Sequence, residues 1–310
     1  MKGFYIVLPL AMVILLGMAL RAKGFFSADD KDRLARLLYW VVLPVMFLRT
    51  TYLAGDSIIL HSNLAVAAYA AIAFTPAAAF VIASALTHRG DRMRQAISAM
   101  AAGRSNNVYL GIPACLLALG PEGMEAASLY VALTVPGYQI ASILCGEAVM
   151  SGTITRESLA RCASRVAKNP LVVSCVIGFF VALLEIPVPE FMLTSMKLVS
   201  DMATGLALLA LGLSLEVKGL LPAFRGAWHD ALIKLFLHPA LTWAFLLIWP
   251  APDIFFKSAV LLAAMPTAVN TFIIAGGMGL DEKYACEVVA LSTAFSALSI
   301  PAWIAILGIS

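Results

Sequence analysis

Residues 96–118 read AISAMAAGRSNNVYLGIPACLLA and carry the pattern that decides the fold. The run is apolar and long enough to cross a bilayer, for which about 20 residues suffice. Asn107 and Pro113 nevertheless stand near its middle, with Gly103 and Gly111 beside them. Proline removes one helical hydrogen bond and clashes with the carbonyl of the preceding turn, and backbone groups freed in this way are costly in lipid. We therefore expect a spanning helix that is interrupted at its centre.

A second run of the same kind covers residues 257–278 and contains Met-Pro-Thr-Ala-Val-Asn at 265–270, followed by Gly276 and Gly277. A pair of interrupted helices at corresponding places in two halves of a membrane protein points to a substrate site. The N-termini of half-helices and Asn side chains offer hydrogen-bond donors to an anionic group. The alternative interpretation is that proline and glycine only kink two packed helices.

The composition excludes a water-soluble fold. Of the 310 residues, 62% are hydrophobic and 13% are charged, and the mean hydropathy is +0.93. A typical soluble domain carries about 25% charged residues. A cytosolic enzyme, a disordered scaffold and a nucleic-acid-binding protein are thus excluded, and an all-α membrane protein is expected. The five cysteines have no close spacing and predict neither disulfides nor a metal site.

Ten apolar runs alternate with turn signals, and they predict ten transmembrane helices. Their approximate bounds are 4–20, 37–53, 63–87, 96–118, 125–150, 170–185, 192–215, 230–249, 257–278 and 284–308. The first run has no small-residue cleavage site after it, so we expect a retained helix and not a signal peptide. Fifteen of the 21 Lys and Arg residues follow the odd-numbered spans. Such segments face the cytoplasm, so both termini are expected on the periplasmic side of a bacterial inner membrane.

The first five spans then begin outside and end inside, and the next five do the reverse. This is the layout of two inverted repeats, expected over residues 1–150 and 170–310 with a cytoplasmic linker over 151–169. A proline inside spans three and eight (Pro76 and Pro239) is a weak echo between the halves. The interrupted helices are spans four and nine, which are equivalent members of the two repeats.

The order of several short motifs resembles the auxin efflux carrier family, which includes plant PIN carriers and bacterial permeases for malonate or malate. The motifs are LPL (8–10), LLG (15–17), RAKGFF (21–26), LP (43–44), NVYLGIP (107–113), KNPL (168–171), IPVPEF (186–191), LALLALG (206–212) and MPTAVN (265–270). They extend over nearly the whole chain. Each motif is loose, but their order and spacing together are fairly specific.

This resemblance implies a scaffold domain and a transport domain, with broken helices four and nine crossing at their prolines and the substrate bound beside the crossing. It also implies an elevator-type, alternating-access movement and a homodimer through the scaffold helices. Asn107, Pro113, Pro266 and Asn270 occupy the matching positions, whereas Thr267 replaces the second of two prolines that the family commonly has. The family's charged pair in span three is not evident, so the plant hormone is not the expected substrate.

Charged residues inside spans are functional candidates, because insertion of one costs about 2.5–3.5 kcal/mol. Arg104 stands one turn before Asn107, and its guanidinium could bind a substrate carboxylate with two hydrogen bonds. It could equally snorkel to the inner surface or pair with an acid. Ser105 and Asn106 could bind the substrate or satisfy backbone groups at the break.

Asp201 lies near the middle of span seven, four residues after Lys197, so the two share a helix face. Either they form an internal ion pair, or Asp201 takes up a proton or helps to bind Na⁺ and couples transport to a gradient. His238 precedes Pro239 in span eight and is interpreted as a packing residue rather than a proton relay. No metal or other cofactor is expected, apart from a proton or sodium as coupling ion.

The function expected is a secondary transporter, or permease, for small organic anions, most simply carboxylates. Motifs of hydrolases and of ATP-driven pumps (HExxH, GxSxG, GxxxxGK[ST]) are absent, so an enzyme is not expected. The alternative is a sodium-coupled symporter similar to the bile-acid transporter family. The partners expected are the anion and the lipid bilayer, without nucleic acid. The predicted substrate site comprises Arg104, Ser105, Asn106, Asn107, Pro113, Pro266, Thr267 and Asn270.

Overall fold

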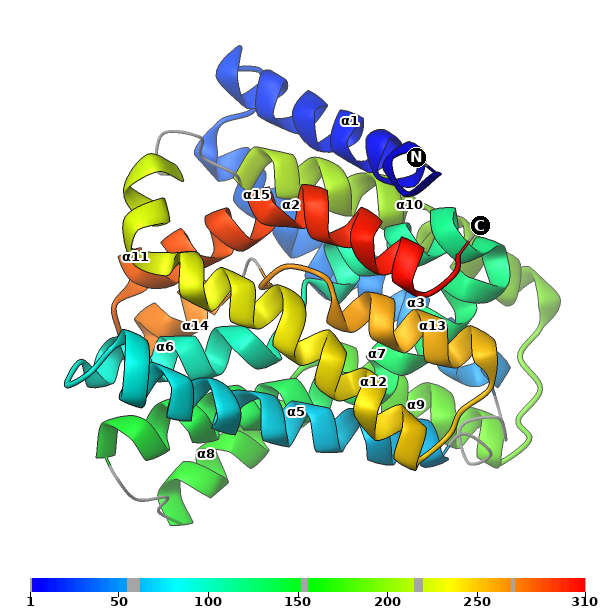
Figure 1. Ribbon diagram of the computed structural model, residues 1–310. Coiled ribbons are helices and arrows are strands. Elements are labelled where there is room, and N and C mark those ends of the chain that lie inside the picture. Colours follow the sequence, from blue (N-terminus) through cyan, green and yellow to red (C-terminus); the bar gives the residue numbers. More distant parts are fainter. Residues whose placement is uncertain (1, 55–61, 152–155, 215–219, 269–270, 310) are drawn as a thin grey trace.

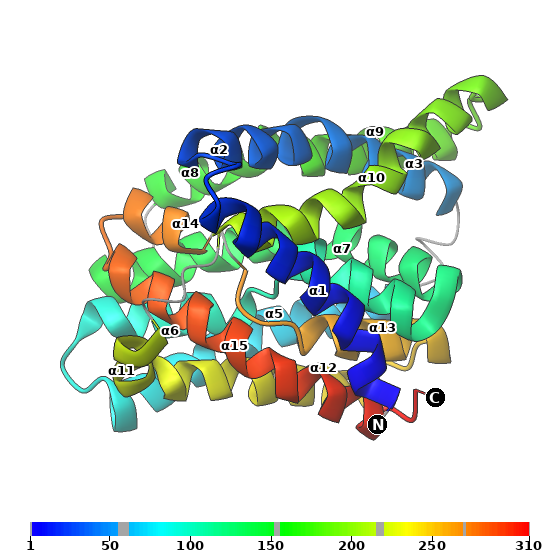
Figure 2. The ribbon, with the colours of Figure 1, turned by 90° about the horizontal axis from the view of Figure 1, so that it is seen from above.

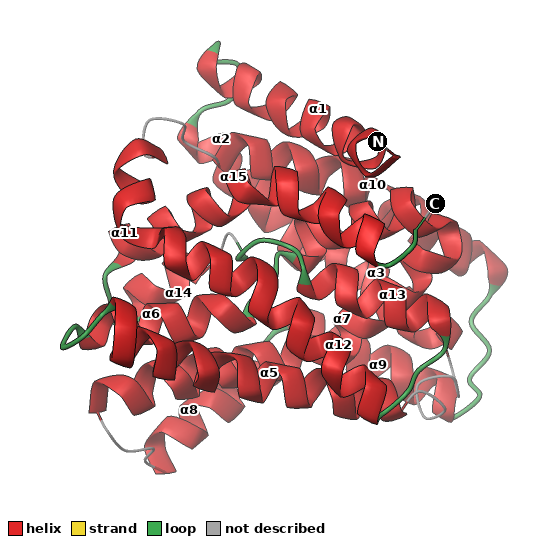
Figure 3. Cartoon of the chain, viewed as in Figure 1, coloured by secondary structure: helices red, strands yellow, loops and turns green. Residues whose placement is uncertain are grey.

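The computed structural model describes residues 2–54, 62–151, 156–214, 220–268 and 271–309. Within these ranges every regular element is a helix (Figure 3), which confirms the all-α expectation. Among the described residues, four helices are long and apolar enough to cross a membrane, namely Ser62–Thr87, Glu190–Ala210, Gly226–Ile248 and Glu282–Ile306. Shorter apolar helices cover Ala11–Ala22, Leu38–Leu53 and Pro170–Leu183.

The helices follow the predicted spans closely. The first half of the chain contains α1 (Lys2–Ala22), α2 (Ala28–Leu37), the π-helical turn η1 (Leu38–Val42), α3 (Leu43–Ala54), α5 (Ser62–Ile82), η2 (Ala83–Thr87), α6 (Arg92–Gly103), η3 (Asn107–Gly111) and α7 (Ile112–Ser151). The second half contains α8 (Arg156–Ala167), α9 (Pro170–Leu183), α10 (Glu190–Ser214), α11 (Leu220–Leu232), η5 (Ile233–Leu237), α12 (His238–Ile248), α13 (Asp253–Ala263), α14 (Thr271–Gly277) and α15 (Glu282–Ile306).

Local sequence signals account for several of the helix boundaries. Helix α7 is two helices that meet at Gly120, whose φ of 75° lies in the left-handed region that favours glycine. The Asn169 side chain caps α9 by accepting hydrogen bonds from the N–H groups of Leu171 and Val172, with Pro170 in the first turn. The non-helical backbone at Gly120 therefore separates predicted spans four and five.

Two helices occupy segments for which no helix is expected from the sequence. Helix α2 follows α1, and α8 lies within the predicted linker. Both are short and rich in charged residues, with their apolar residues gathered on one side. Helices of this kind bind at membrane surfaces. Their high content of charged residues resembles that of connecting loops, so the sequence does not predict them as helices.

The helices form two packed groups. In the smaller group, α3 packs against α9 and α10, and α10 packs against α1. The larger group contains α5, α6, α11, α12, α14 and α15. Helix α7 packs against members of both groups, and α13 packs against α7, α12, α5 and α15. Figure 1 shows α5 and α12 running side by side in the larger group, and Figure 2 shows α1 lying across α10. Helices α6 and α14 of the larger group belong to the two interrupted helices, and η3 at the first interruption contacts α10 of the smaller group.

The contact between α1 and α10 depends on two glycines. The Cα atoms of Gly17 and Gly212 face each other so closely that a Cβ on Gly212 would lie 3.0 Å from Gly17 Cα and would overlap the carbonyl oxygen of Ile14. Small residues of this kind let helix backbones approach within membranes, where van der Waals packing holds helices together.

Replacing Gly212 by alanine is therefore expected to push α1 and α10 apart, with a loss of about 1–3 kcal/mol of stability. Thermal unfolding of the purified protein in detergent, followed by tryptophan fluorescence, measures the change. Gly205→Ala is the matched control, because a Cβ at Gly205 on the same helix meets no atom within 4 Å. Equal midpoints for the two variants would contradict the packing role of Gly212.

Candidate functional site

The first interruption lies between α6 and η3. The Asp91 side chain caps α6 by accepting a hydrogen bond from Arg94 N–H, and the helix ends at Gly103. Arg104 then has φ −105° and ψ 96°, which is extended backbone. Gly103 is required here because a Cβ would stand 2.9 Å from Cγ of Pro76 on α5. The break therefore falls where a glycine, two asparagines and the nearby Pro113 all disfavour a continuous helix.

The second interruption lies between α13 and α14. Helix α13 ends at Ala263, and Met265 to Ala268 form a non-helical segment before α14 begins at Thr271. Pro266 cannot donate a helical hydrogen bond, and it restricts the residue before it. Both interruptions that the sequence predicts are thus present.

The two interrupted segments cross and pair with each other. Asn106 N–H donates to the carbonyl of Pro266 at 2.7 Å, and Ala268 N–H donates to the carbonyl of Arg104 at 2.9 Å. These bonds make an isolated antiparallel bridge between Ser105 and Thr267. Backbone hydrogen-bonding groups left free at one interruption are thereby paired with groups at the other. Non-helical backbone is stable inside a membrane when its polar groups have partners of this kind.

Polar side chains gather around this crossing. Arg104 is only 6% exposed, and its Nη1 donates to Ser142 Oγ at 3.0 Å and to the Tyr138 carbonyl at 3.5 Å. Asn107 Nδ2 donates to the Tyr138 hydroxyl at 2.7 Å. Ser142 and Tyr138 lie in the second part of α7, so this segment forms one wall of the site. Neither residue is conspicuous in the sequence, since both read as ordinary polar positions in span five.

Several buried polar atoms at the crossing have no hydrogen-bond partner among the described residues. They are Asn107 Oδ1, Asn106 Nδ2 and Thr271 Oγ1. A buried polar group without a partner costs about 1–3 kcal/mol, and native proteins keep few of them. Asn106 Nδ2 and Thr271 Oγ1 can donate hydrogen bonds to a polar, anionic ligand, and a guanidinium such as that of Arg104 can pair with its charge.

The crossing is closed in this conformation. The space beside Arg104 is lined by Pro76, Met100, Gly103, Tyr138, Ala141 and Ser142 and is too narrow for a water molecule. Entry of a ligand beside Arg104 therefore requires a change from this conformation.

The remaining predicted site residues differ in where they lie. Ser105, Pro266 and Thr267 form the crossing itself and are buried. Pro113 is buried at the start of α7, beyond η3, and its role in the substrate site stays a prediction. Asn270 lies outside the described residues. Asp201 accepts a hydrogen bond from Lys197 at 2.7 Å on an exposed face of α10, so the predicted pair exists and its coupling role stays a prediction.

Lys234 is a site residue for which the sequence analysis offers no role. It stands in η5, is fully buried, and its Nζ donates to Ser105 Oγ at 2.8 Å and to the Ala263 carbonyl at 2.7 Å. It therefore contacts both interruptions at once. A charged residue inside a predicted span is a functional candidate. Lys234 meets this criterion as Arg104 does, because it lies inside predicted span eight between Ile233 and Leu235.

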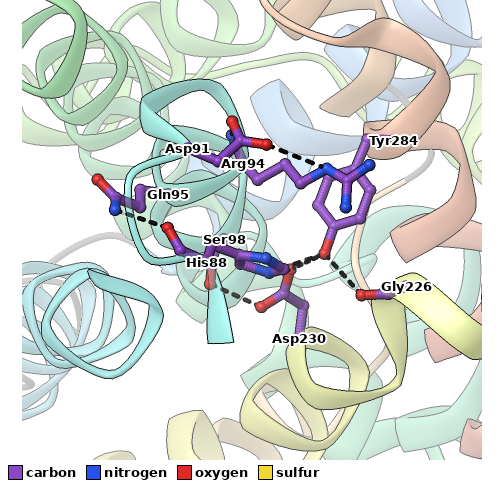
Figure 4. Close-up of polar contacts among 8 residues, drawn as sticks. All are labelled: His88, Asp91, Arg94, Gln95, Ser98, Gly226, Asp230 and Tyr284. Atoms are coloured by element: carbon purple, nitrogen blue, oxygen red, sulfur yellow. Dashed lines mark hydrogen bonds and ion pairs between the residues drawn. The ribbon is translucent and has the colours of Figure 1, made fainter. Parts of the chain in front are cut away.

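A second buried polar cluster joins α6, α11, α15 and the end of η2 (Figure 4). Its centre is the Asp230 carboxylate, which accepts hydrogen bonds from Ser98 Oγ at 2.7 Å and from the Tyr284 hydroxyl at 2.7 Å. His88 Nε2 lies 3.3 Å from the same carboxylate, and the Arg94 guanidinium stacks over the Tyr284 ring at 4.7 Å. This cluster fixes the first half of the interrupted helix four against spans eight and ten.

Removing the Asp230 carboxylate is expected to destabilise the fold. Asp230→Leu leaves the Ser98 hydroxyl without its acceptor, which costs about 1–3 kcal/mol for a buried group, whereas the Tyr284 hydroxyl keeps the Gly226 carbonyl at 3.1 Å. Thermal unfolding in detergent measures the loss, with Asp201→Asn as the control because exposed ion pairs contribute about 0–1 kcal/mol. An unchanged midpoint for Asp230→Leu would show that the cluster does not hold these helices together.

The fold and the crossing together define a polytopic helical membrane protein with a buried polar site between its helices. The chain belongs to the family described as membrane transport protein, whose sequence pattern matches residues 3–304. This confirms the resemblance to the auxin efflux carriers, and the protein is a membrane transporter and not an enzyme.

Two relatives illustrate the family. A Rhizobium meliloti (strain 1021) protein named "Putative malonate transporter" is 30% identical over 231 residues, which cover 72% of this chain and 70% of that protein. A Methanothermobacter thermautotrophicus protein named "Uncharacterized transporter" is 24% identical over 306 residues, which cover 97% of each chain.

Proposed function

We propose that the protein is a secondary transporter of small organic anions, with carboxylates as its substrates and the crossing of helices four and nine as its binding site. The observation that carries this proposal is the buried Arg104 guanidinium beside unpaired polar atoms of Asn106, Asn107 and Thr271. Guanidinium is the side chain best suited to bind a carboxylate with two hydrogen bonds. The name of the Rhizobium relative makes malonate the first acid to test.

We further propose that the two halves are inverted repeats and that transport follows an elevator-type, alternating-access movement. The larger helix group would carry the crossing past α1, α3, α9 and α10. The closed space beside Arg104 supports this, since a carrier must occlude its site while it moves. The one-sided distribution of basic residues supports cytoplasmic odd-numbered connections and periplasmic termini.

The test is solid-supported-membrane electrophysiology on proteoliposomes. The panel contains malonate, other mono- and dicarboxylates and an aromatic acid, each with and without Na⁺, and empty liposomes are the control. We expect a saturable current for at least one small carboxylate. Electroneutral exchange gives no current, so acids that give none are repeated as labelled counterflow. Absence of current and counterflow for every acid would contradict the proposal, and strict Na⁺ dependence would favour the sodium-coupled alternative.

A further inference from the structure

The environment of Lys234 Nζ fits a neutral amine better than an ammonium group. A neutral lysine amine has two N–H donors and a lone pair, and a protonated one has three N–H donors and no lone pair. Two acceptors meet this nitrogen among the described residues, Ser105 Oγ at 2.8 Å and the Ala263 carbonyl at 2.7 Å. In this conformation two N–H donors of Lys234 Nζ therefore have acceptors. Protonation adds a third N–H donor, and that donor has no acceptor among the described residues.

The charge of a protonated Lys234 also has no counterion in this conformation. Among the described residues no carboxylate forms an ion pair with it. An isolated buried charge is strongly unfavourable unless it is paired and hydrogen-bonded. A carboxylate that enters the crossing would supply both the missing acceptor and the missing negative charge.

Two titratable residues one turn away from Lys234 have hydrogen-bond partners of their own. Asp230, one turn earlier on the same helix run (yellow in Figure 1), accepts hydrogen bonds from Ser98 and Tyr284. His238, one turn later, is fully buried, and its Nδ1 lies 2.9 Å from Thr75 Oγ1 on α5. The groups on the neighbouring elements are His88 at the end of η2, Arg94 of α6, Arg104 at the first break, and Tyr284 and Glu287 of α15.

We propose that Lys234 Nζ is the proton-binding site that couples this carrier to the proton gradient. The inference rests on the proposed carboxylate transport and assigns its coupling ion. On one side of the membrane the amine lone pair takes a proton from water as the anion binds, so that one N–H bond forms. On the other side the anion leaves, that N–H bond breaks, and the proton returns to water. No electron is transferred.

Thermodynamic linkage gives the coupling its direction. If anion binding stabilises the ammonium form, protonation must tighten anion binding by the same factor. An acidic compartment therefore favours loading, and an alkaline one favours release. Arg104 keeps its charge throughout, so it provides binding while Lys234 provides the dependence on pH.

The test compares two transport modes in proteoliposomes, with labelled malonate as the probe, or whichever acid of the panel the wild type transports. Counterflow at equal pH on both sides measures movement of the loaded carrier, and accumulation against a concentration gradient under an inward proton gradient measures coupling. Lys234→Arg places a permanent cation at the site. We expect the proton-driven accumulation of this variant to fall at least tenfold further than its counterflow. The control is Lys257→Gln, which removes a lysine paired with Asp253 at the start of α13.

A second measurement detects the proton uptake directly. Adding the transported acid to the wild-type protein in weakly buffered detergent solution should remove protons from the medium, which a pH-sensitive dye detects, and Lys234→Met should abolish this uptake. Proton-driven accumulation by Lys234→Arg equal to wild type, or binding by the wild type without proton uptake, overturns the inference while carboxylate transport stands. A wild type that transports no carboxylate overturns both proposals.

Discussion

Replacing Asn107 by alanine is expected to lower the rate of carboxylate transport by at least about 30-fold while the protein still folds. The Nδ2 group of this residue donates one N–H to the Tyr138 hydroxyl at 2.7 Å, and its second N–H can donate to a substrate carboxylate. A hydrogen bond to a charged group contributes about 1.5–3 kcal/mol, and loss of the positioned amide removes both this contact and the order at the break. Initial rates of labelled counterflow in proteoliposomes measure the effect.

The matched control for this prediction is Asn63→Ala. The Asn63 amide lies at the exposed start of α5, where it donates to the Pro250 carbonyl at 3.3 Å. We expect its loss to change the rate less than twofold. The sequence motif predicts the same large loss for Asn270→Ala, a position outside the described residues. Wild-type rates for both Asn107→Ala and Asn270→Ala would remove the crossing as the substrate site.

Replacing Arg104 by glutamine is expected to raise the KM for carboxylates by at least about 100-fold, because truncating one partner of a buried charge pair costs about 2–5 kcal/mol. Arg104→Lys keeps the positive charge but loses the planar guanidinium that binds a carboxylate with two hydrogen bonds. We therefore expect its KM to lie between those of the wild type and Arg104→Gln. Concentration series of the transport current measure both. Arg36→Gln on the exposed face of α2 is the control.

Stability separates a binding role for Arg104 from a structural one. Burying a guanidinium carries a desolvation cost, so a neutral residue of similar size at this position should be tolerated or even stabilise the protein. We expect the thermal midpoint of Arg104→Gln in detergent to be no lower than that of the wild type. A large loss of stability together with the loss of transport would assign Arg104 to the packing of α6 against α7 instead.

Much of the fold could be predicted because membrane helices carry strong local signals. Apolar length locates α5, α10 and α15 directly, and proline with asparagine inside an apolar run locates both interruptions. The charged helices α2 and α8 could not be predicted in this way, because their polarity is typical of loops. The inverted repeat, the domain bounds, the orientation and the homodimer stay predictions.

The candidate site could be predicted only where its residues lie within a motif. Arg104 to Asn107 and Pro266 to Thr267 are adjacent in sequence, and the structure brings these two segments together. Tyr138, Ser142 and Lys234 reach the crossing from other helices, between 31 and 129 residues away from their partners. Asp230 and Tyr284 are likewise 54 residues apart. Pairings of this kind depend on how helices pack, which no local pattern encodes.

The most direct test of the central claim is a crystal structure with a bound substrate analogue. A brominated malonate that competes with the transported acid would be located by its anomalous scattering. The account predicts a bromine peak at the crossing, with the analogue's carboxylates within hydrogen-bonding distance of the Arg104 guanidinium and the Asn107 amide. A saturable competitor whose only peak lies away from both interrupted helices would contradict it.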